Sequence, residues 1–518
     1  MLLLAWAFFL LRPDGAGAAT RPSFVLIQLD DFANLHFDSR WVDSFGTTRR
    51  SMPLTRQELL ARGVRFTGYQ APTPVCAPSR ASLLSGRYAV NHGVRRVSDD
   101  EAGGWTAFRN NEIHDQNLAV WLQSGGYRTM QFGKFMNFYM EPDGYPTAVR
   151  PPGWDVWQAD ANDESTREFY GYSLNLNGTI GGPFGAADYG PGTEKDPEGC
   201  PELILEACNY HTDAITTRAI EQIASTPADQ PLFAHLGYHT PHGDSRPPIG
   251  PEPAVRHYDS AGGTPRPNPP GYGERDVSDK PPWISTLPRP SAQRGAAIRT
   301  DFRKSIEALR SVDESVARIF DALEDTGRLD STFVFLFSDN GFFHGEHRIV
   351  RGKSYPYEPA VQVPMLVRGP GVPEGRRSGE LVANQDIAPT VLSLAGVGAG
   401  RPMDGRSMVR FWESPRTQSR RPILLDAYAD LGQGTTEPTG GEFYTGIRVG
   451  PYKYVRYRSG DRELYDLSTD PHEERNRIGD PNYRRVTRYL KRQLDAYWGC
   501  AGAECRKPAP KWPLPGPR

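Results

Sequence analysis

Two pairs of oxygen-bearing side chains each follow a short apolar run. Asp30 and Asp31 come directly after FVLIQL, and Asp339 and Asn340 follow TFVFLF with one serine between. Either pair alone could form a turn or cap a helix, as aspartate and asparagine do in many proteins. Three carboxylates and one amide oxygen, with no thiolate in the set, favour Ca²⁺ over zinc, and Mg²⁺ is the next choice after Ca²⁺. The two pairs therefore predict a site for a hard cation.

One of the five cysteines lies where a helix is expected to begin. Cys76 stands in VCAPSRASLLSGRY, in which Pro78 fits the first helical turn and Gly86 fits the end of the helix. Backbone N–H groups at a helix start attract anions, and Arg80 adds a positive charge in the same turn. A cysteine that has no partner for a disulfide is commonly a small buried hydrophobic residue. At a helix start, an unmodified cysteine would instead be a thiolate of low pKa and a possible nucleophile.

Basic side chains follow two further apolar runs. Lys134 comes two residues after YRTMQF, and His239 and His242 come after LFAHLG. Lysines are usually solvated surface charges, and loop histidines often bond only to nearby backbone groups. However, only nine of the 60 basic residues are lysine, so a lysine that directly follows a strand is less easily explained in this way.

The elements that must position these side chains are alternating strands and helices. Short apolar runs alternate with helical periods, which predicts an α/β fold with a mostly parallel sheet. The carboxyl ends of parallel strands share one edge, so the polar residues after the four runs should meet there. Apolar residues three and four apart over 301–326 predict a core helix that ends at Gly327. The segment 247–290 contains 12 prolines and predicts a long loop that forms a rim over the site.

After about residue 410 the pattern changes. Strand-like runs separated by polar turns cover 422–428, 443–449 and 452–457, and a helical period covers 483–497. This pattern is typical of a smaller α+β unit. The predicted organisation is a signal peptide over 1–20, a large α/β domain over 21–410 and an α+β domain over 411–518.

Charge and composition narrow the function classes. The 518 residues include 60 Lys and Arg against 62 Asp and Glu, for a formal net charge of −2. This balance provides no field for holding nucleic acid or an anionic membrane. With 38% hydrophobic residues the composition is that of a globular protein, which excludes disorder, collagen and coiled coil.

The N-terminus and the cysteines indicate export. The opening run MLLLAWAFFLL is too short to span a bilayer, and the small residues around Ala18 fit a cleavage site, although a charged region before the run is missing. Cys200 with Cys208, and Cys500 with Cys505, are close pairs that could form disulfides in an oxidising compartment. We therefore expect a secreted, periplasmic or lysosomal protein without an integral membrane span, whose N-terminal segment is either cleaved or kept as a lipid or membrane anchor.

The segment CAPSR at 76–80 resembles the C-x-P-S-R signature of the sulfatase family, whose cysteine is converted to formylglycine after translation. Several independent motifs in the family's order argue against a chance match. They are GYRTMQFGKFMN (126–137), TPHGD (240–244), FSDNGFFHGEH (337–347), VPMLVRGPG (363–371), NQDIAPTVLSLAG (384–396) and ELYDLSTDPHEERN (463–476). The resemblance implies an alkaline-phosphatase-like catalytic domain.

Within this family, the chain looks most like the N-acetylglucosamine-6-sulfatases and their extracellular heparan endosulfatase relatives. PPGWDVW at 151–157 and FYGYSLNLNG at 169–178 contribute to this likeness. The endosulfatases carry a long basic insertion that this sequence lacks, so an exo-acting enzyme or one for small substrates is expected. A broad arylsulfatase remains an alternative.

The resemblance implies a role for each matching residue. Asp30, Asp31, Asp339 and Asn340 would hold a Ca²⁺ that residue 76 also faces. As hydrated formylglycine, residue 76 would attack sulfur with one hydroxyl, and the other hydroxyl would later expel sulfate. A serine has no second hydroxyl for this release.

The basic residues would surround the sulfate. Arg80 would hold the hydrate, and Lys134, His242 and Lys353 would contact the sulfate oxygens, where positive charge stabilises the transition state. His242 follows a proline as in the family's PH motif and would protonate the leaving alcohol. The remaining histidines are weaker candidates. His239 would at best support a residue that contacts the sulfate, and His344 and His347 are candidates for the rim of the site, although a role in the fold alone is the more expected one for these two. The implied partners are a formylglycine-generating enzyme and a sulfated small molecule or glycan.

One departure leaves a role open. Many sulfatases have a histidine two residues after the lysine of the GK motif, which takes a proton from the hydrated aldehyde, whereas this sequence has Met136. The glucosamine-6-sulfatase-like subset also lacks that histidine, and Asn137 cannot act as a base. Two other classes stay open: a phosphomonoester or phosphodiester hydrolase of the same superfamily, and a binder of sulfated glycans if Cys76 is unmodified. The eleven histidines do not show the spacing of a two-zinc phosphatase.

Overall fold

The structure is a computed structural model that describes residues 21–43, 45–139, 149–161, 169–185, 210–243, 250–414, 419–428 and 442–510. The predicted signal peptide, Cys200 and Cys208 lie outside the described residues. No helix of the described ranges is both long and apolar enough to cross a membrane.

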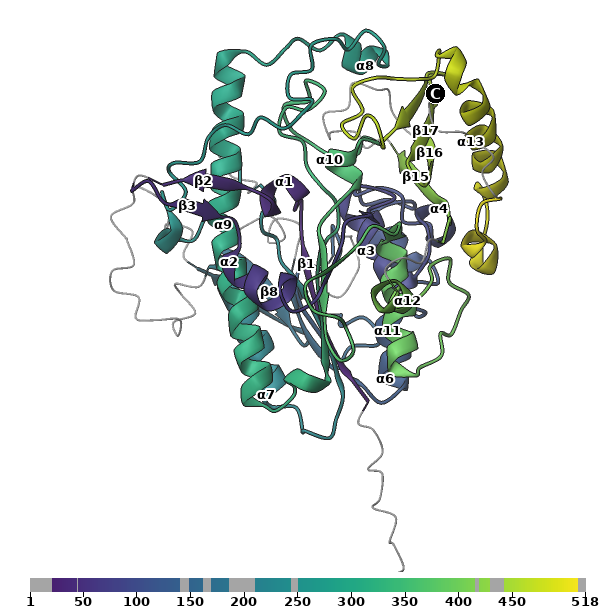
Figure 1. Ribbon diagram of the computed structural model, residues 1–518. Helices are drawn as coiled ribbons and strands as arrows, with labels where there is room; N and C mark the ends of the chain where they lie inside the picture. Colours follow the sequence, from purple (N-terminus) through teal and green to yellow (C-terminus); the bar gives the residue numbers. More distant parts are fainter. Residues whose placement is uncertain are drawn as a thin grey trace, which may run out of the picture.

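A ten-stranded sheet forms the centre of the molecule (Figure 1). Its five inner strands, from β11 to β7, are parallel, and the strands outside them include antiparallel pairs. The predicted mostly parallel sheet is therefore confirmed. In spatial order the strands are β13 (Arg376–Ser378), β4 (Val64–Phe66), β12 (Met365–Arg368), β11 (Thr332–Ser338), β1 (Ser23–Leu29), β10 (Leu232–Gly237), β6 (Arg128–Gly133), β7 (Val156–Asp160), β8 (Tyr172–Leu176) and β9 (Thr179–Phe184).

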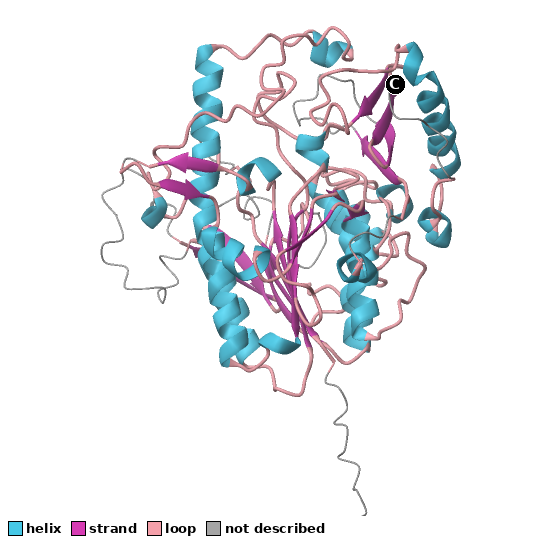
Figure 2. Cartoon of the chain, viewed as in Figure 1, coloured by secondary structure: helices cyan, strands magenta, loops and turns pink. Residues whose placement is uncertain are grey.

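Helices cover both faces of this sheet (Figures 1 and 2). Alternate residues of β1 point to opposite faces, so Phe24 and Leu26 join one apolar cluster while Val25 and Ile27 join the other. Strands buried on both sides consist of continuous apolar residues, which explains why the four runs could be found in the sequence. The first cluster includes residues of α3 (Cys76–Ser85), α6 (Leu118–Ser124) and α11 (Ile387–Ala395), and the second includes residues of α7 (His211–Ala224) and α9 (Ala292–Asp325).

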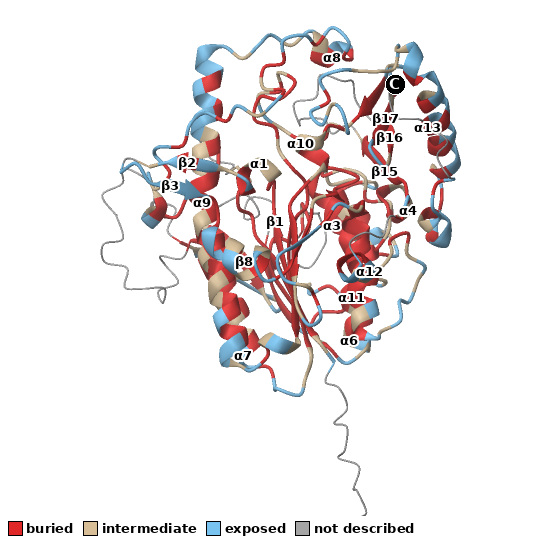
Figure 3. Cartoon of the chain, viewed as in Figure 1, coloured by how far each residue is buried: buried red, intermediate tan, exposed pale blue. Residues whose placement is uncertain are grey.

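The long helix α9 begins earlier than predicted. The expected start was residue 301, whereas the helix begins at Ala292, and the Ser291 hydroxyl accepts a hydrogen bond from the Arg294 N–H at 3.2 Å. Most residues of 292–300 are exposed (Figure 3), so this part of the helix has no apolar stripe that periodicity could detect. The predicted end is confirmed, since the helix stops at Asp325, shortly before Gly327.

The C-terminal part forms a separate four-stranded antiparallel sheet with one helix against it, so the predicted smaller α+β unit is confirmed. The sequence pattern predicted three of the four strands and not the last one, over 462–466. Cys500 and Cys505 form a disulfide, as predicted. The domain boundary at 410 stays a prediction. The elements are β15 (Ile423–Tyr428), β16 (Glu442–Val449), β17 (Tyr452–Tyr457), β18 (Arg462–Asp466) and α13 (Arg484–Tyr497).

Short elements connect these parts. The described part of the proline-rich segment, 250–290, is mostly loop, as predicted, and contains only η4 (Val255–His257) and α8 (Pro282–Ser285). The remaining elements are α1 (Asn34–Phe37), β2 (Arg40–Val42), β3 (Thr48–Arg50), α2 (Pro53–Thr55), η1 (Arg56–Leu60), β5 (Tyr69–Gln70), α4 (Ala89–His92), α5 (Gly104–Asn110), η5 (Leu329–Ser331), α10 (Glu358–Val361), β14 (Val382–Ala383), η6 (Asn384–Asp386), α12 (Val409–Glu413), η7 (Pro481–Tyr483) and η8 (Gly502–Arg506).

Candidate active site

The ends of β1 and β11 bring the two acidic pairs together. The Asp339 N–H donates to the Leu29 carbonyl at 3.1 Å, and the Asp31 N–H donates to Asp339 Oδ1 at 3.4 Å. The Asn340 side-chain amide donates to Asp31 Oδ1 at 2.6 Å. Asp31 has a φ of +61°, a left-handed conformation that is uncommon outside glycine and that clusters at functional sites. The four residues therefore form one buried cluster at the predicted edge.

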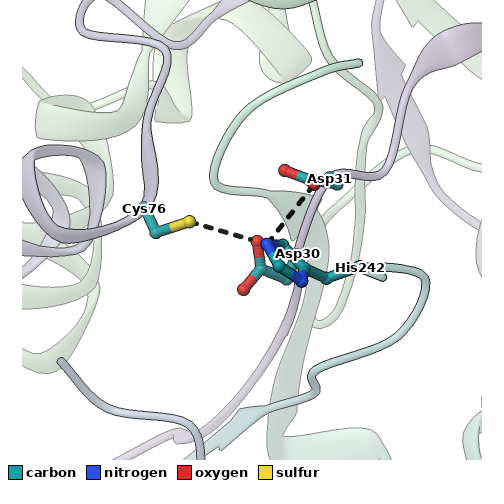
Figure 4. Close-up of side chains that lie close together, drawn as sticks. All are labelled: Asp30, Asp31, Cys76 and His242. Atoms are coloured by element: carbon teal, nitrogen blue, oxygen red, sulfur yellow. Dashed lines mark hydrogen bonds and ion pairs between the residues drawn. The ribbon is translucent and has the colours of Figure 1, made fainter. Parts of the chain in front are cut away.

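Cys76 is the first residue of α3 and points toward this cluster (Figure 4). Its Sγ lies 3.3 Å from Asp30 Oδ1 and 2.9 Å from Lys353 Nζ, and the residue is 2% exposed. Burial, followed by the charge of Asp30, raises the pKa of the thiol to about 12, although Lys134 and Lys353 oppose this shift. The prediction of a low-pKa thiolate is therefore wrong, because the helix start is enclosed and faces a carboxylate.

Three buried cations balance the three carboxylates. The Lys134 ammonium is paired with Asp30, and Lys353 Nζ lies 2.5 Å from Asp31 Oδ1. Burial by itself lowers the pKa of each lysine, but attraction to these carboxylates and to Cys76 leaves both pKa values above their usual range. The ammonium groups therefore stay charged, as contacts to an anion require.

Arg80 connects the cluster to neighbouring backbone. Its Nε and Nη2 each lie 2.9 Å from Asp339 Oδ2, and its Nη1 donates to the Lys134 carbonyl at 2.8 Å. Burial raises the pKa of Asp339 to about 6, and the charge of Asp30 acts in the same direction, while Arg80 opposes both. The guanidinium therefore stabilises the ionised form of this carboxylate.

His242 closes the cluster from the segment after β10 (Figure 4). Its Nε2 lies 3.7 Å from Asp31 Oδ2, and its Nδ1 lies 2.8 Å from the Gly243 carbonyl, so Nδ1 must carry the proton. Burial lowers the pKa of this histidine to about 4, although Asp31 and Asp30 act against the shift. One potential ligand atom each from Asp30, Asp31, Cys76 and His242 lies within 4.8 Å of the others, close enough to share a metal ion.

The oxygen donors fit a calcium ion. Asn340 Oδ1 is buried and has no hydrogen-bond partner among the described residues, although buried carbonyl oxygens are normally paired. An unpaired amide oxygen next to the Asp30, Asp31 and Asp339 carboxylates is a donor set of the kind that Ca²⁺ prefers. The donor chemistry therefore fits the predicted cation, whereas the group of ligand atoms that lie within 4.8 Å of one another contains Cys76 and His242 and not Asp339.

Two supporting residues were missed. The Ser79 hydroxyl donates to the Asp339 carbonyl at 2.5 Å, and the Asn384 amide donates to that hydroxyl. Both contacts hold the backbone that carries the acidic pair. Ser79 belongs to the CAPSR segment and Asn384 begins the NQDIAPT motif, so their places in recognised motifs were the available signal.

His239 lies beside His242. The two ring centroids are 4.9 Å apart, and the centroids of the His239 and Phe169 rings are also 4.9 Å apart. His239 is fully buried, yet neither ring nitrogen has a hydrogen-bond partner in the described part of the chain. An unpaired buried polar group costs about 1–3 kcal/mol. Burial, followed by the charge of His242, holds the pKa of His239 well below its usual value.

The predicted rim histidines are buried. His344 and His347 are each 1% exposed, so their placement at the rim is wrong. His344 Nε2 lies 2.8 Å from His36 Nε2, and His347 Nδ1 lies 2.7 Å from Glu274 Oε2. The proline-rich segment covers this loop, since Tyr272 bridges to Glu346. Met136 is also fully buried and packs in the apolar cluster on the α3 face of the sheet.

The fold and the site together define an alkaline-phosphatase-like α/β protein in which a cluster of acidic side chains and a cysteine at a helix start share one edge of the sheet. The family model described as Sulfatase matches residues 22–397, and a second model, described as N-sulphoglucosamine sulphohydrolase, C-terminal, matches residues 345–498. The chain belongs to the sulfatase family.

Curated relatives include extracellular and N-acetylglucosamine sulfatases. An extracellular sulfatase Sulf-1 homolog from Caenorhabditis elegans is 32% identical over 396 residues, which are 73% of this chain and 49% of that protein. An extracellular sulfatase SULF-1 homolog from Drosophila melanogaster is matched over 33% of its length. The chain therefore spans half or less of the length of these two relatives. The N-acetylglucosamine-6-sulfatase of Homo sapiens is 27% identical over 529 residues, which are 95% of this chain and 88% of that protein.

Solved structures share the fold. One, described as a complex with its substrate D-glucosamine-2-N,6-O-disulfate, has a TM-score of 0.70 and 22% identity and covers 92% of this chain and 97% of its own. A phosphonate monoester hydrolase from Silicibacter pomeroyi has a TM-score of 0.64 and 21% identity, with 92% and 94% covered. At these identities the likeness shows the fold alone.

Proposed function

We propose that the chain is a formylglycine-dependent sulfuric ester hydrolase that removes sulfate from a sugar such as 6-O-sulfated N-acetylglucosamine. The observation that carries this proposal is the convergence of three carboxylates and three buried cations on Cys76 at the start of α3. Membership of the sulfatase family supports the ester class. The N-acetylglucosamine-6-sulfatase relative, matched over 88% of its length, supports the sugar.

The acidic cluster would hold one Ca²⁺. Asp30, Asp31 and Asp339 offer carboxylate oxygens, and Asn340 offers its buried Oδ1, which has no hydrogen-bond partner in the part of the chain that the structure describes. Bound there, the ion would polarise the sulfate ester and the nucleophile at residue 76. Although burial by itself raises the pKa of Asp30, the charges of Lys134, Lys353 and Arg80 hold that pKa well below its usual value, which favours the ionised form that a hard cation requires.

Residue 76 would act after conversion to formylglycine. A two-hydroxyl hydrate at this position would supply an attacking oxygen for sulfur and a second hydroxyl that allows sulfate to be released. The surroundings of Cys76 Sγ fit oxygen at this place: Lys353 is a donor at 2.9 Å, and Asp30 Oδ1 is an acceptor at 3.3 Å. Arg80 would hold the hydrate from within the first turn of α3.

The basic residues would bind the sulfate and assist the leaving group. Lys134 and Lys353 are charged, buried and adjacent to residue 76 or its acidic partners, so their ammonium groups can donate to sulfate oxygens in a site of low dielectric. His242 would donate a proton to the leaving alcohol from Nε2. Because burial holds its pKa near 4, this role requires the negative charge of the bound ester to raise that pKa.

Mass spectrometry of residue 76 tests the proposal directly. The tryptic peptide that contains Cys76, from protein made in its native host, should be about 18 Da lighter than the cysteine form. The converted protein should hydrolyse 6-O-sulfated N-acetylglucosamine, and a Cys76→Ala variant should not. An unmodified thiol in active protein would contradict the mechanism.

A phosphoryl hydrolase is the second candidate, since a phosphonate monoester hydrolase shares the fold. Phosphate and phosphonate monoesters therefore belong in the same assay. Turnover of these esters above that of sulfate esters would replace the proposed substrate class. Binding of sulfated sugars without turnover by the cysteine form would instead indicate a glycan-binding protein.

Export and maturation complete the proposal. The Cys500–Cys505 disulfide supports an oxidising compartment, and two relatives are named extracellular sulfatases. Conversion of Cys76 requires a formylglycine-generating enzyme before α3 folds, because the thiol is 2% exposed in the folded chain. Coexpression with such an enzyme should raise the converted fraction.

A further inference from the structure

His239 is a buried histidine of the site that the proposed mechanism does not use. It is 0% exposed, and its two ring nitrogens have no hydrogen-bond partner among the residues that the structure describes. Native proteins pair nearly all buried polar groups, so an imidazole with two unpaired nitrogens calls for an explanation. A ligand that supplies the partners when it binds is one explanation, and a tolerated packing defect is the other.

A nearby histidine shows that side chains of this region can provide hydrogen-bond partners for both nitrogens of a buried imidazole. His235, in β10, is 1% exposed; its Nδ1 donates to Gln131 Oε1 at 2.8 Å, and its Nε2 lies 2.9 Å from the side-chain amide of Gln28, whose NH₂ group can donate to it. Both glutamines come from strands adjacent to β10, namely β6 and β1. Four residues later, where the chain leaves β10, neither ring nitrogen of His239 has a hydrogen-bond partner among the described residues.

The position of His239 is set by the strand ends on either side. The Lys134 N–H donates to the Gly237 carbonyl at 2.8 Å, and the Asp30 N–H donates to the Thr240 carbonyl at 3.3 Å. The segment 237–240 is thus attached to the residues after β6 and β1. The imidazole of His239 lies next to the ring of His242. The charges of Lys134 and Asp30 both affect the pKa of His239, in opposite directions. His239 therefore lies beside His242, which the proposed function places next to the leaving alcohol.

We propose that His239 contacts the substrate directly, with one ring nitrogen donating to an oxygen of the sulfate ester and the other accepting from a hydroxyl of the sugar. The inference rests on the proposed function and deepens it, because it assigns a residue that distinguishes sugar sulfates from other sulfate esters.

The chemistry of the imidazole selects such a substrate. A neutral imidazole has one N–H donor and one acceptor nitrogen. Sulfate oxygens only accept hydrogen bonds, so a sulfate group by itself can satisfy one nitrogen. A sugar sulfate also carries hydroxyl donors near the ester and can satisfy both. An aryl sulfate without hydroxyl groups leaves the acceptor nitrogen unpaired, and a site built for a hydroxyl discriminates against an analogue that lacks it.

The test compares His239→Phe with the matched control His235→Phe. Substrates are N-acetylglucosamine 6-sulfate and 4-nitrophenyl sulfate, and each preparation is normalised to its converted fraction at residue 76. His239→Phe should lower kcat/KM about 100-fold for the sugar sulfate and about tenfold for the aryl sulfate, since two contacts are lost in one case and one in the other. Its thermal midpoint should equal or exceed that of the parent, because phenylalanine removes two unpaired polar atoms.

His235→Phe should behave differently in the thermal scan. It leaves Gln28 and Gln131 without their shared partner, so its midpoint should fall. A similar fall for His239→Phe would assign that residue a structural role and overturn the proposal. An unchanged ratio between the two substrates would also overturn it.

A binding measurement separates this proposal from the proposed function. In the Cys76→Ala background, calorimetry with N-acetylglucosamine 6-sulfate should give an affinity that His239→Phe reduces at least tenfold. No binding to the Cys76→Ala protein itself would count against the sugar sulfate as substrate and so against the proposed function. Binding that is equal with and without His239 would count against the assignment of His239 alone.

Discussion

Two buried arginines, one inside the proposed active site and one outside it, allow the effect of an ion pair on stability to be separated from its effect on activity. Arg80 is 1% exposed and is paired with Asp339 inside the site, whereas Arg421 is also 1% exposed and is paired with Asp386 at 2.8 Å and 2.5 Å. Asp386 and Arg421 belong to none of the proposed catalytic roles. Replacing either arginine by methionine keeps most of the side-chain volume and removes the charge.

The two substitutions should cost similar stability. Each leaves one carboxylate buried without its partner, and breaking a buried ion pair in this way costs about 3–5 kcal/mol. Arg80→Met retains some compensation, because Lys353 and Lys134 also act on Asp339. We therefore expect about 3 kcal/mol for Arg80→Met and about 4 kcal/mol for Arg421→Met, measured by urea unfolding at 25 °C.

Activity should separate the two variants. If Arg80 holds the nucleophile and shields its charge, Arg80→Met should lower kcat about 10²–10³-fold per converted molecule, the range for loss of one preorganised donor. Arg421→Met should retain activity within a few-fold at temperatures where it is folded. Mass spectrometry of residue 76 supplies the normalisation. Equal activity losses in the two variants would refute the assigned role of Arg80 and indicate that it only stabilises the fold.

Three further predictions concern the metal, pH and the disulfide. Chelation by EGTA should lower both activity and the thermal midpoint, Ca²⁺ should restore them better than Mg²⁺, and Asn340→Ala should weaken the calcium response; no effect of chelation would count against the metal site. Burial raises the pKa of Glu346 to about 7, above the value of 4.5 in an unfolded chain. The folded state then keeps a proton that the unfolded state releases, so the free energy of unfolding should fall by up to about 3 kcal/mol as pH rises from 4.5 through 7. Glu346→Gln should flatten this dependence in urea titrations, and an unchanged slope would assign it to other groups. Replacing Cys500 and Cys505 by serine opens a small loop and should cost about 2 kcal/mol, with no loss of kcat; a large loss of kcat would show that the C-terminal unit acts on the site.

The strand ends explain why much of the site was predictable. A strand buried on both faces must be continuously apolar, so runs such as FVLIQL and TFVFLF were visible without any structure. The polar residue that ends such a run is then placed at a known edge of the sheet. Asp30, Asp31, Asp339 and Asn340 were found in this way, and the structure brings them into contact.

Burial and partners were not predictable in the same way. The helix start and Arg80 suggested a low pKa for Cys76, but the enclosed position and the Asp30 carboxylate raise it to about 12. His344 and His347 belong to a motif that looked exposed, whereas the loop over 250–290 covers them. The first turns of α9 also lacked an apolar stripe, because most of their residues face solvent.

The sequence by itself determined the class of sheet, four of its central strands, the family and the chemical types at the site, because these follow from local patterns and motifs. Only the tertiary structure decided which groups are buried, which cation pairs with which carboxylate, and which polar atoms stay unpaired. Those properties depend on segments distant in the chain, such as the pairing of Lys353 with Asp31 and the position of His239 between strand ends. Electrostatic free energies change steeply with burial and distance, so residue types and spacing cannot supply them.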